Sequence, residues 1–147
     1  MINYIKSAED TLRQRGAMDD ALDNLRKRQQ RIIAENRPSG YPSASFSETY
    51  TSTSRANDAV SELVDLAEIQ REIDRTEAEI KEIDAVLDQL PQEESDIIRA
   101  WYIDRISMDA IAEQMCYESR STIYDKRNHA VADFAVRYFG AVAIGRE

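Results

Sequence analysis

The sequence predicts an all-α protein, and three of its features support this fold class. Glycine and proline are scarce, at four and three of 147 residues, while 32% of the residues are charged, which is typical of helix-rich proteins. Apolar residues recur at intervals of three and four along residues 66–90, the spacing of one helix face. The last third contains short amphipathic segments that follow serine residues suited to capping helices.

A first long helix is expected over residues 3–35. Gly16 weakens its first half, because glycine is a poor helix former. Its second half includes the basic segment "LRKRQQRII", residues 25–33. The apolar residues that fall near helical spacing are Tyr4, Ala8, Leu12, Met18, Leu22, Leu25 and Ile32.

A connector is expected over residues 36–55, "NRPSGYPSASFSETYTSTSR". The stretch is rich in Ser and Thr and contains two prolines and a glycine, which is typical of loops. A plain linker is the favoured interpretation. The alternative is a partner-binding loop that uses Tyr41, Phe46 and Tyr50.

A second long helix is expected over residues 56–90, where no Gly or Pro intervenes before Pro91. Eight positions in it follow the 3-4 spacing of a coiled-coil seam, and only Thr76 among them is not apolar. Self-association through this stripe is the favoured interpretation, and an antiparallel hairpin with the first helix is the alternative. The residues expected at a dimer seam are Leu66, Ile69, Ile73, Ile80, Ile83, Leu87 and Leu90.

Three shorter helices are expected over residues 92–105, 107–115 and 119–140. Ser107 and Ser119 are suited to cap the second and third of these, and a glycine ends the last one. The stretch "CYE" would form the turn between them. These elements predict a three-helix helix-turn-helix domain.

The predicted organisation is therefore a helical hairpin or coiled coil over residues 1–90, followed by a helix-turn-helix domain over residues 91–147. In such a domain the last helix lies in the DNA major groove and contacts bases through its N-terminal half. If Ile123 faces inward, helical geometry turns Ala130 and Phe134 in nearly the same direction. The other side chains expected in this small core are Trp101, Ile111 and Met115.

The opposite face of the last helix carries polar side chains that could reach base edges, and its start and flanks carry groups suited to phosphates. Base contacts are expected from Ser121, Tyr124, Asp125 and Asn128. Phosphate contacts are expected from Arg120, Thr122, Lys126, Arg127 and His129, beside the capping residue Ser119.

The chain carries a net charge of -9, but the charge is unevenly distributed. Residues 56–90 contain three basic and eleven acidic residues, whereas residues 119–131 contain three Lys or Arg and one acidic residue. Binding to phosphates requires local positive charge rather than a positive total. The net negative charge of the chain therefore weakens the DNA interpretation. The local positive charge of the last predicted helix supports it.

Several kinds of function are disfavoured by residue usage. Cys116 is the only cysteine of the chain and His129 is its only histidine. The chain therefore lacks an internal disulfide and a cysteine-based zinc cluster, and we expect no metal and no cofactor. No glycine-rich phosphate loop or Ser/His/Asp set is present, so we do not expect an enzyme. With no signal-peptide pattern and no long apolar run, a cytoplasmic protein without membrane contact is expected.

A family resemblance adds to this interpretation. The segment "MDAIAEQMCYESRSTIYDKRNHAV" resembles region 4 of sigma-70-type factors, and "IYDKRNHAVADFAVRYFG" is similar to the small phage regulators of the ArpU and RinA type. The resemblance implies an activator of phage late genes or autolysin-type genes in a bacterial host cell, with two N-terminal helices and a polar connector. The matching positions are Tyr124, Arg127, Ala130, Val131, Phe134 and Ala135.

The leading hypothesis is a sequence-specific transcriptional regulator that binds double-stranded DNA as a homodimer or a higher homo-oligomer. RNA polymerase is a further partner to consider, through the acidic helix over residues 56–90. One alternative is a packaging or assembly protein similar to small terminase subunits, which join a helix-turn-helix to a coiled coil. Another is an adaptor of RNA polymerase that does not bind DNA.

Overall fold

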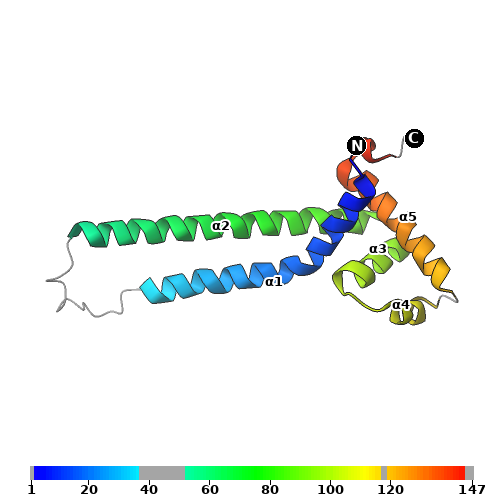
Figure 1. Ribbon diagram of the computed structural model, residues 1–147, viewed down its shortest axis with the longest axis horizontal. Helices are drawn as coiled ribbons and strands as arrows, with labels where there is room; N and C mark the ends of the chain where they lie inside the picture. Colours follow the sequence, from blue (N-terminus) through cyan, green and yellow to red (C-terminus); the bar gives the residue numbers. More distant parts are fainter. Residues whose placement is uncertain (1, 37–51, 117–118, 145–147) are drawn as a thin grey trace. The chain divides into compact units, whose positions relative to one another are not determined.

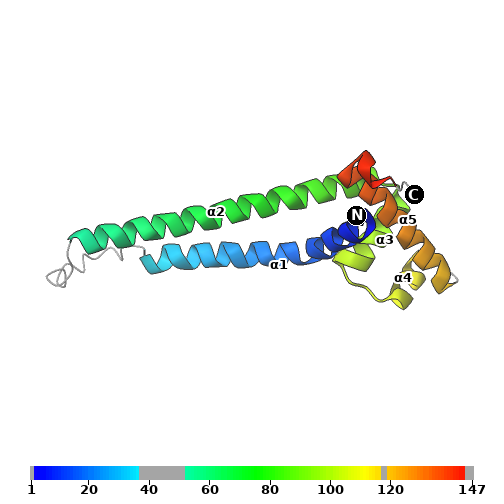
Figure 2. The same ribbon diagram turned by 45° about the horizontal axis from the view of Figure 1, so that its top comes forward.

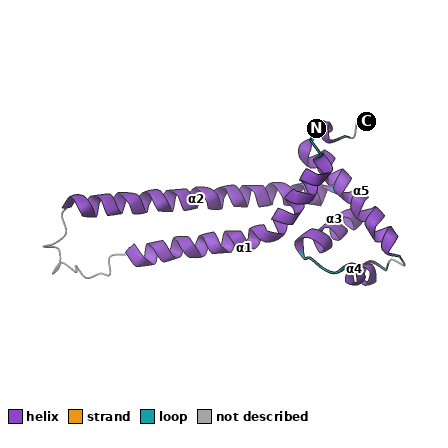
Figure 3. Cartoon of the chain, in the orientation of Figure 1, coloured by secondary structure: helices purple, strands orange, loops and turns teal. Residues whose placement is uncertain are grey.

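The computed structural model describes residues 2–36, 52–116 and 119–144, and within these ranges it is helical without strands. The all-α prediction is therefore confirmed (Figures 1 and 3). The longer helices are α1 (Tyr4–Asn36), α2 (Ser52–Gln89), α3 (Gln92–Ile98), α4 (Met108–Met115) and α5 (Arg120–Phe139). A π-helical turn, η2 (Arg99–Ile103), continues α3, and a short 3-10 turn, η3 (Ala141–Ala143), follows α5.

These bounds lie close to the helices expected from the sequence. The capping predictions are confirmed, because the Oγ atoms of Ser107 and Ser119 accept hydrogen bonds from the backbone N–H groups of Ala110 and Thr122. Gly140 follows α5 with φ 89°, a conformation that L side chains rarely adopt. Local sequence signals therefore determine where these helices begin and end.

The connector differs from its expected bounds. Residues 52–55, expected in the loop, belong to the first turn of α2, so this helix begins earlier than the heptad pattern suggested. The three aromatic residues considered for partner binding, Tyr41, Phe46 and Tyr50, lie outside the described residues.

The chain divides into two compact units. Residues 20–77 form one, which we call the helix-pair unit, and residues 1–19 and 78–147 form the other, which we call the core unit. The division falls inside both long helices rather than after residue 90. The last turns of α2 therefore belong with the three C-terminal helices.

In the helix-pair unit, α1 and α2 run side by side in opposite directions (Figures 1 and 2). Arg26 pairs with Glu77, and the Nε2 of Gln29 donates to the Oε1 of Gln70 at 2.7 Å. The Arg26–Glu77 pair joins the basic stretch of α1 to the acidic stretch of α2. Between the helices the unit buries a small set of apolar side chains, namely Leu22, Ile69 and Ile73.

The core unit buries a larger cluster of apolar side chains. The start of α1 contributes Leu12, the end of α2 contributes Leu87, and α5 contributes Phe134, all fully buried. Burying one such side chain stabilises the folded state by about 1.5–3 kcal/mol. The other members of this cluster are Ala8, Ile83, Val86, Leu90, Ile97, Ile98, Ala100, Tyr102, Ile111, Ile123, Ala130, Val131 and Ala135.

The heptad stripe of α2 is an internal packing surface in this structure. Ile69, Ile73, Ile83, Leu87 and Leu90 are buried by other parts of the same chain. The remaining seam residues, Leu66 and Ile80, are half-buried. The expected dimer seam is thus not an exposed surface, and the intramolecular alternative accounts for its burial.

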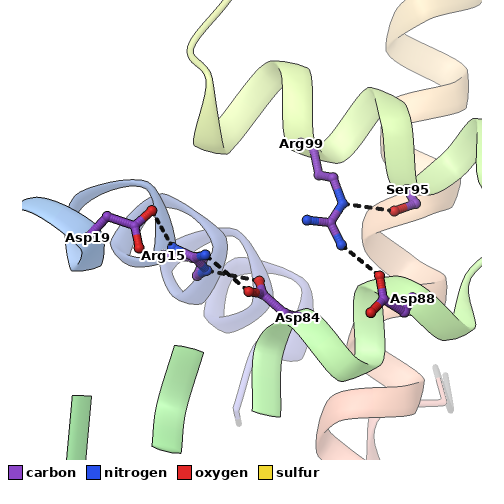
Figure 4. Close-up of polar contacts among 6 residues, drawn as sticks. All are labelled: Arg15, Asp19, Asp84, Asp88, Ser95 and Arg99. Carbon is purple, nitrogen blue, oxygen red and sulfur yellow. Dashed lines mark hydrogen bonds and ion pairs between the residues drawn. The ribbon is translucent and has the colours of Figure 1, made fainter. Parts of the chain in front are cut away.

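Figure 4 shows two arginine side chains, Arg15 and Arg99, whose polar contacts connect helices within the core unit. The buried Arg15 donates to Asp84 through Nε at 2.9 Å and Nη2 at 3.0 Å, and to Asp19 through Nη1 at 3.1 Å. Its hydrogen bond with Asp84 raises the pKa of Arg15, so the guanidinium stays charged. Arg99 forms a more exposed counterpart, donating to Asp88 at 2.9 Å and to the Oγ of Ser95 at 3.2 Å.

Candidate nucleic-acid interface

The candidate interface is built on α4 and α5, which follow one another in the chain. Helix α4 ends at Met115 and is followed by Cys116, whose left-handed backbone (φ 58°, ψ 34°) stops the helix. Residues 117–118 lie outside the described residues, and Ser119 then caps α5. Cys116 is exposed at this turn, as expected of a turn residue.

The inward face of α5 agrees with the expectation from helical geometry. Ile123, Ala130 and Phe134 have no exposed surface and pack in the core cluster together with the fully buried Ile111 of α4. Met115 and Trp101 are half-buried and pack against this cluster. The face of α5 on the opposite side is thereby turned toward solvent.

The residues expected to contact DNA are nearly all exposed. Tyr124 has 41% of its surface exposed, and Arg127 is the one half-buried member of the set. The remaining exposed members are Ser119, Arg120, Ser121, Thr122, Asp125, Lys126, Asn128 and His129. They lie in the first half of α5, the part that a recognition helix uses.

Arg127 is held in place by aromatic rings. Its Cζ lies 4.6 Å from the centre of the Trp101 ring and 5.2 Å from the centre of the Tyr124 ring. The two rings meet edge to face with their centres 5.7 Å apart, and Arg127 also donates to the Oδ1 of Asn128 at 2.8 Å. Tyr124 therefore takes part in packing while its ring remains partly exposed.

The other two cations of this region pair with acidic side chains of the same unit. The Nη2 of Arg120 lies 3.0 Å from the Oδ1 of Asp109 on α4. The Nζ of Lys126 lies 3.6 Å from the Oε2 of Glu93 on α3. Pairs between such exposed side chains contribute only about 0–1 kcal/mol, so a phosphate can compete for both cations.

One cluster of titratable side chains was not anticipated from the sequence. The Nε2 of His129 lies 3.3 Å from the Oε1 of Glu94 on α3 and 3.6 Å from the Oδ2 of Asp133, one turn further along α5. Burial, followed by the hydrogen bond and charge of Asp133, raises the pKa of Glu94 to about 7, although His129 and Arg137 act in the opposite direction. The sequence spacing could reveal His129 and Asp133 on one helix face, but not the distant Glu94.

Among the described residues, no helix is both long and apolar enough to cross a membrane. Comparison with models of protein families, with curated proteins and with solved structures gave no significant match.

Proposed function

We propose that the protein is a sequence-specific DNA-binding transcriptional regulator, of the phage or prophage late-gene type, that reads the major groove with α5. One observation carries this proposal. The first half of α5 presents an exposed polar face, with Ser121, Asp125 and Asn128, directly opposite the buried side chains that fix the helix on the core.

The dimensions and chemistry of this face suit the groove. An α-helix with its side chains is about 10–12 Å wide, and the major groove of B-DNA is about 12 Å wide. The amide of Asn128 is a group that can pair with adenine, and the guanidinium of Arg120 is one that can pair with guanine or a phosphate. Because Trp101 and Tyr124 already orient Arg127, little side-chain freedom is lost when this cation meets a phosphate.

The charge of the chain limits the strength of this interaction. The reading half of α5 contains Arg120, Lys126 and Arg127, so one protomer would displace about three counterions, and the binding constant would fall with salt with a logarithmic slope of about -3. The net charge of -9 opposes further nonspecific binding. We therefore propose weak nonspecific binding and a dependence on either a second protomer or RNA polymerase.

A homodimer would present two copies of α5 to half-sites separated by one helical turn or a multiple of it. Since the heptad stripe packs internally, such a dimer would need other apolar side chains. In the helix-pair unit the large apolar side chains that remain exposed on α2 are Val60, Leu63 and Val64.

An adaptor that docks on RNA polymerase without binding DNA is the second candidate. The observation that favours it is the neutralisation of Arg120 by Asp109 and of Lys126 by Glu93. These pairs lower the positive potential of the face that would meet the phosphates. This alternative predicts no retention of DNA at any salt concentration.

A gel shift separates the two candidates. The purified chain is titrated into DNA from its own gene neighbourhood and into a scrambled duplex of the same composition, at low and at physiological salt. The regulator proposal expects a shift that is specific for the native duplex and persists at physiological salt. Equal shifts with both duplexes, or no shift, would contradict it, and the absence of any shift would favour the adaptor.

A further inference from the structure

We propose that Glu94, His129 and Asp133 form a binding site for a divalent transition-metal cation, with Zn²⁺ as the best match to the ligand types. One imidazole nitrogen and two carboxylate oxygens from α3 and α5 lie within 4.8 Å of one another. This inference concerns the core unit alone and does not depend on the proposed DNA binding.

The distances between the ligand atoms fit a bound metal ion. Zinc binds imidazole nitrogen and carboxylate oxygen at about 2.0–2.2 Å, which places tetrahedral ligand atoms about 3.4 Å apart. The His129 Nε2 atom lies 3.3 Å from Glu94 Oε1 and 3.6 Å from Asp133 Oδ2. Two edges of the coordination triangle therefore already have the separation that a metal would require.

The backbone holds the three ligands in position. His129 and Asp133 are one turn apart on the same face of α5, the spacing at which helical residues share a zinc ion. Glu94 comes from α3, whose Ile97 and Ile98 are fully buried in the same core cluster as α5. The site thus lies on two helices that pack together, which favours precise ligand placement.

One carboxylate oxygen of Glu94 lacks a hydrogen-bond partner. The Oε2 of Glu94 is buried and has no hydrogen-bond partner, and the Glu94 side chain is only 12% exposed. Burying a carboxylate oxygen without a partner costs free energy, and a bound cation would offset this cost.

Access and ligand number agree with an open site. His129 has 70% of its side chain exposed and Asp133 has 40%, so an ion can reach the ligands from solvent. Three protein ligands leave a fourth position for water. The guanidinium of Arg137 opposes metal binding, because its positive charge already acts on Glu94 as a bound cation would.

The test uses the untagged full chain, stripped with a chelator and titrated at neutral pH. Co²⁺ binding is followed by visible absorption, which reports a tetrahedral site, and Zn²⁺ binding is followed by calorimetry. We expect one ion per chain and a rise in the melting temperature when Zn²⁺ is present, because the ion binds the folded state and links α3 to α5. Absence of binding of both ions would overturn the proposal.

Variants assign the ligands. His129→Ala should weaken Zn²⁺ binding by more than the roughly 10–100-fold typical of losing a supporting outer group, and Asp133→Asn should also weaken it. Asp104→Asn, at an exposed carboxylate of the core unit outside the cluster and outside the proposed DNA-reading face, is the control and should bind Zn²⁺ as the native chain does. Because His129 is largely exposed, its variant should keep the native melting temperature without metal. Equal Zn²⁺ affinity in His129→Ala and the native chain would overturn the assignment.

Discussion

Arg15 and Asp84 form a two-point ion pair between α1 and α2, with Nε–Oδ1 and Nη2–Oδ2 distances of 2.9 Å and 3.0 Å. The Arg15 side chain is only 9% exposed, so its positive charge is compensated mainly by Asp84 and Asp19 rather than by water. Paired carboxylate and guanidinium planes also fix the relative orientation of their side chains. The pair therefore anchors the first helix to the last turns of α2 within the core unit (Figure 4).

Replacing Asp84 by Ala should destabilise the core unit substantially. Removing one partner of a buried pair leaves an uncompensated charge, which costs about 3–5 kcal/mol, and we expect about 2–3 kcal/mol here because Asp19 still pairs with Arg15. Asp88→Ala, which removes the exposed partner of Arg99, is the control and should cost less than about 1 kcal/mol. Denaturant unfolding measures both losses, and similar values for the two variants would show that the Arg15–Asp84 pair stabilises the core unit no more than the Arg99–Asp88 pair.

Gly16→Ala should also destabilise the protein, although alanine is the better helix former. A Cβ atom at position 16 would lie 2.6 Å from the backbone oxygen of Tyr102, closer than real side chains approach. We expect the overpacking cost of about 1–3 kcal/mol to exceed the helix-propensity gain of about 0.5–1 kcal/mol. The reverse change Ala21→Gly, at an exposed position of α1, measures the propensity alone. An increase in melting temperature for Gly16→Ala would show that α1 and η2 do not approach so closely at Gly16 and Tyr102.

The structure predicts different outcomes for substitutions of buried and of exposed apolar residues on α2. Leu87→Ala should lower the free energy of unfolding by about 2–5 kcal/mol at any protein concentration, because Leu87 is fully buried within its own chain. Leu63→Ser, at a side chain with 65% exposure, should leave this free energy nearly unchanged. Unfolding curves and sedimentation at several concentrations test both. If Leu87→Ala dissociated an oligomer while the fold was retained, the apolar heptad stripe of α2 would be a contact between chains.

The only tryptophan of the chain gives a direct signal from the candidate interface. Because the Arg127 guanidinium lies over the Trp101 ring, Arg127→Lys should change the tryptophan emission and remove a contact of about 0.5–1 kcal/mol. Lys126→Arg, at the neighbouring position, is the matched control and should leave the emission unchanged. Emission that is identical in all three proteins would contradict the stacked arrangement.

Helix positions could be predicted from the sequence because their signals are local. Serine caps, the glycine after α5 and the periodicity of the apolar residues each act over a few residues, and the observed helix ends follow them closely. The inward face of α5 could be predicted for the same reason, from Ile123, Ala130 and Phe134.

Features that depend on distant partners could not be predicted in this way. The periodicity of the α2 stripe shows that one face is buried, but it does not show what covers that face. Gly16 was interpreted as a weakness in the helix, whereas the structure places it against Tyr102. The cluster of Glu94 with His129 and Asp133 likewise joins residues whose proximity arises only from the packing of α3 on α5.

DNA binding by the first half of α5, which we propose as the function, is tested most directly by a salt-dependent titration of paired variants. Fluorescence anisotropy with a labelled native duplex is measured for the original chain, for Arg120→Ala combined with Lys126→Ala, and for Arg137→Ala, at an exposed residue in the last turn of the same helix. We expect the double variant to weaken binding and to reduce the salt slope by about 2, and we expect Arg137→Ala to change neither. Equal binding and equal slopes for all three proteins would contradict the assignment of α5 as the reading helix.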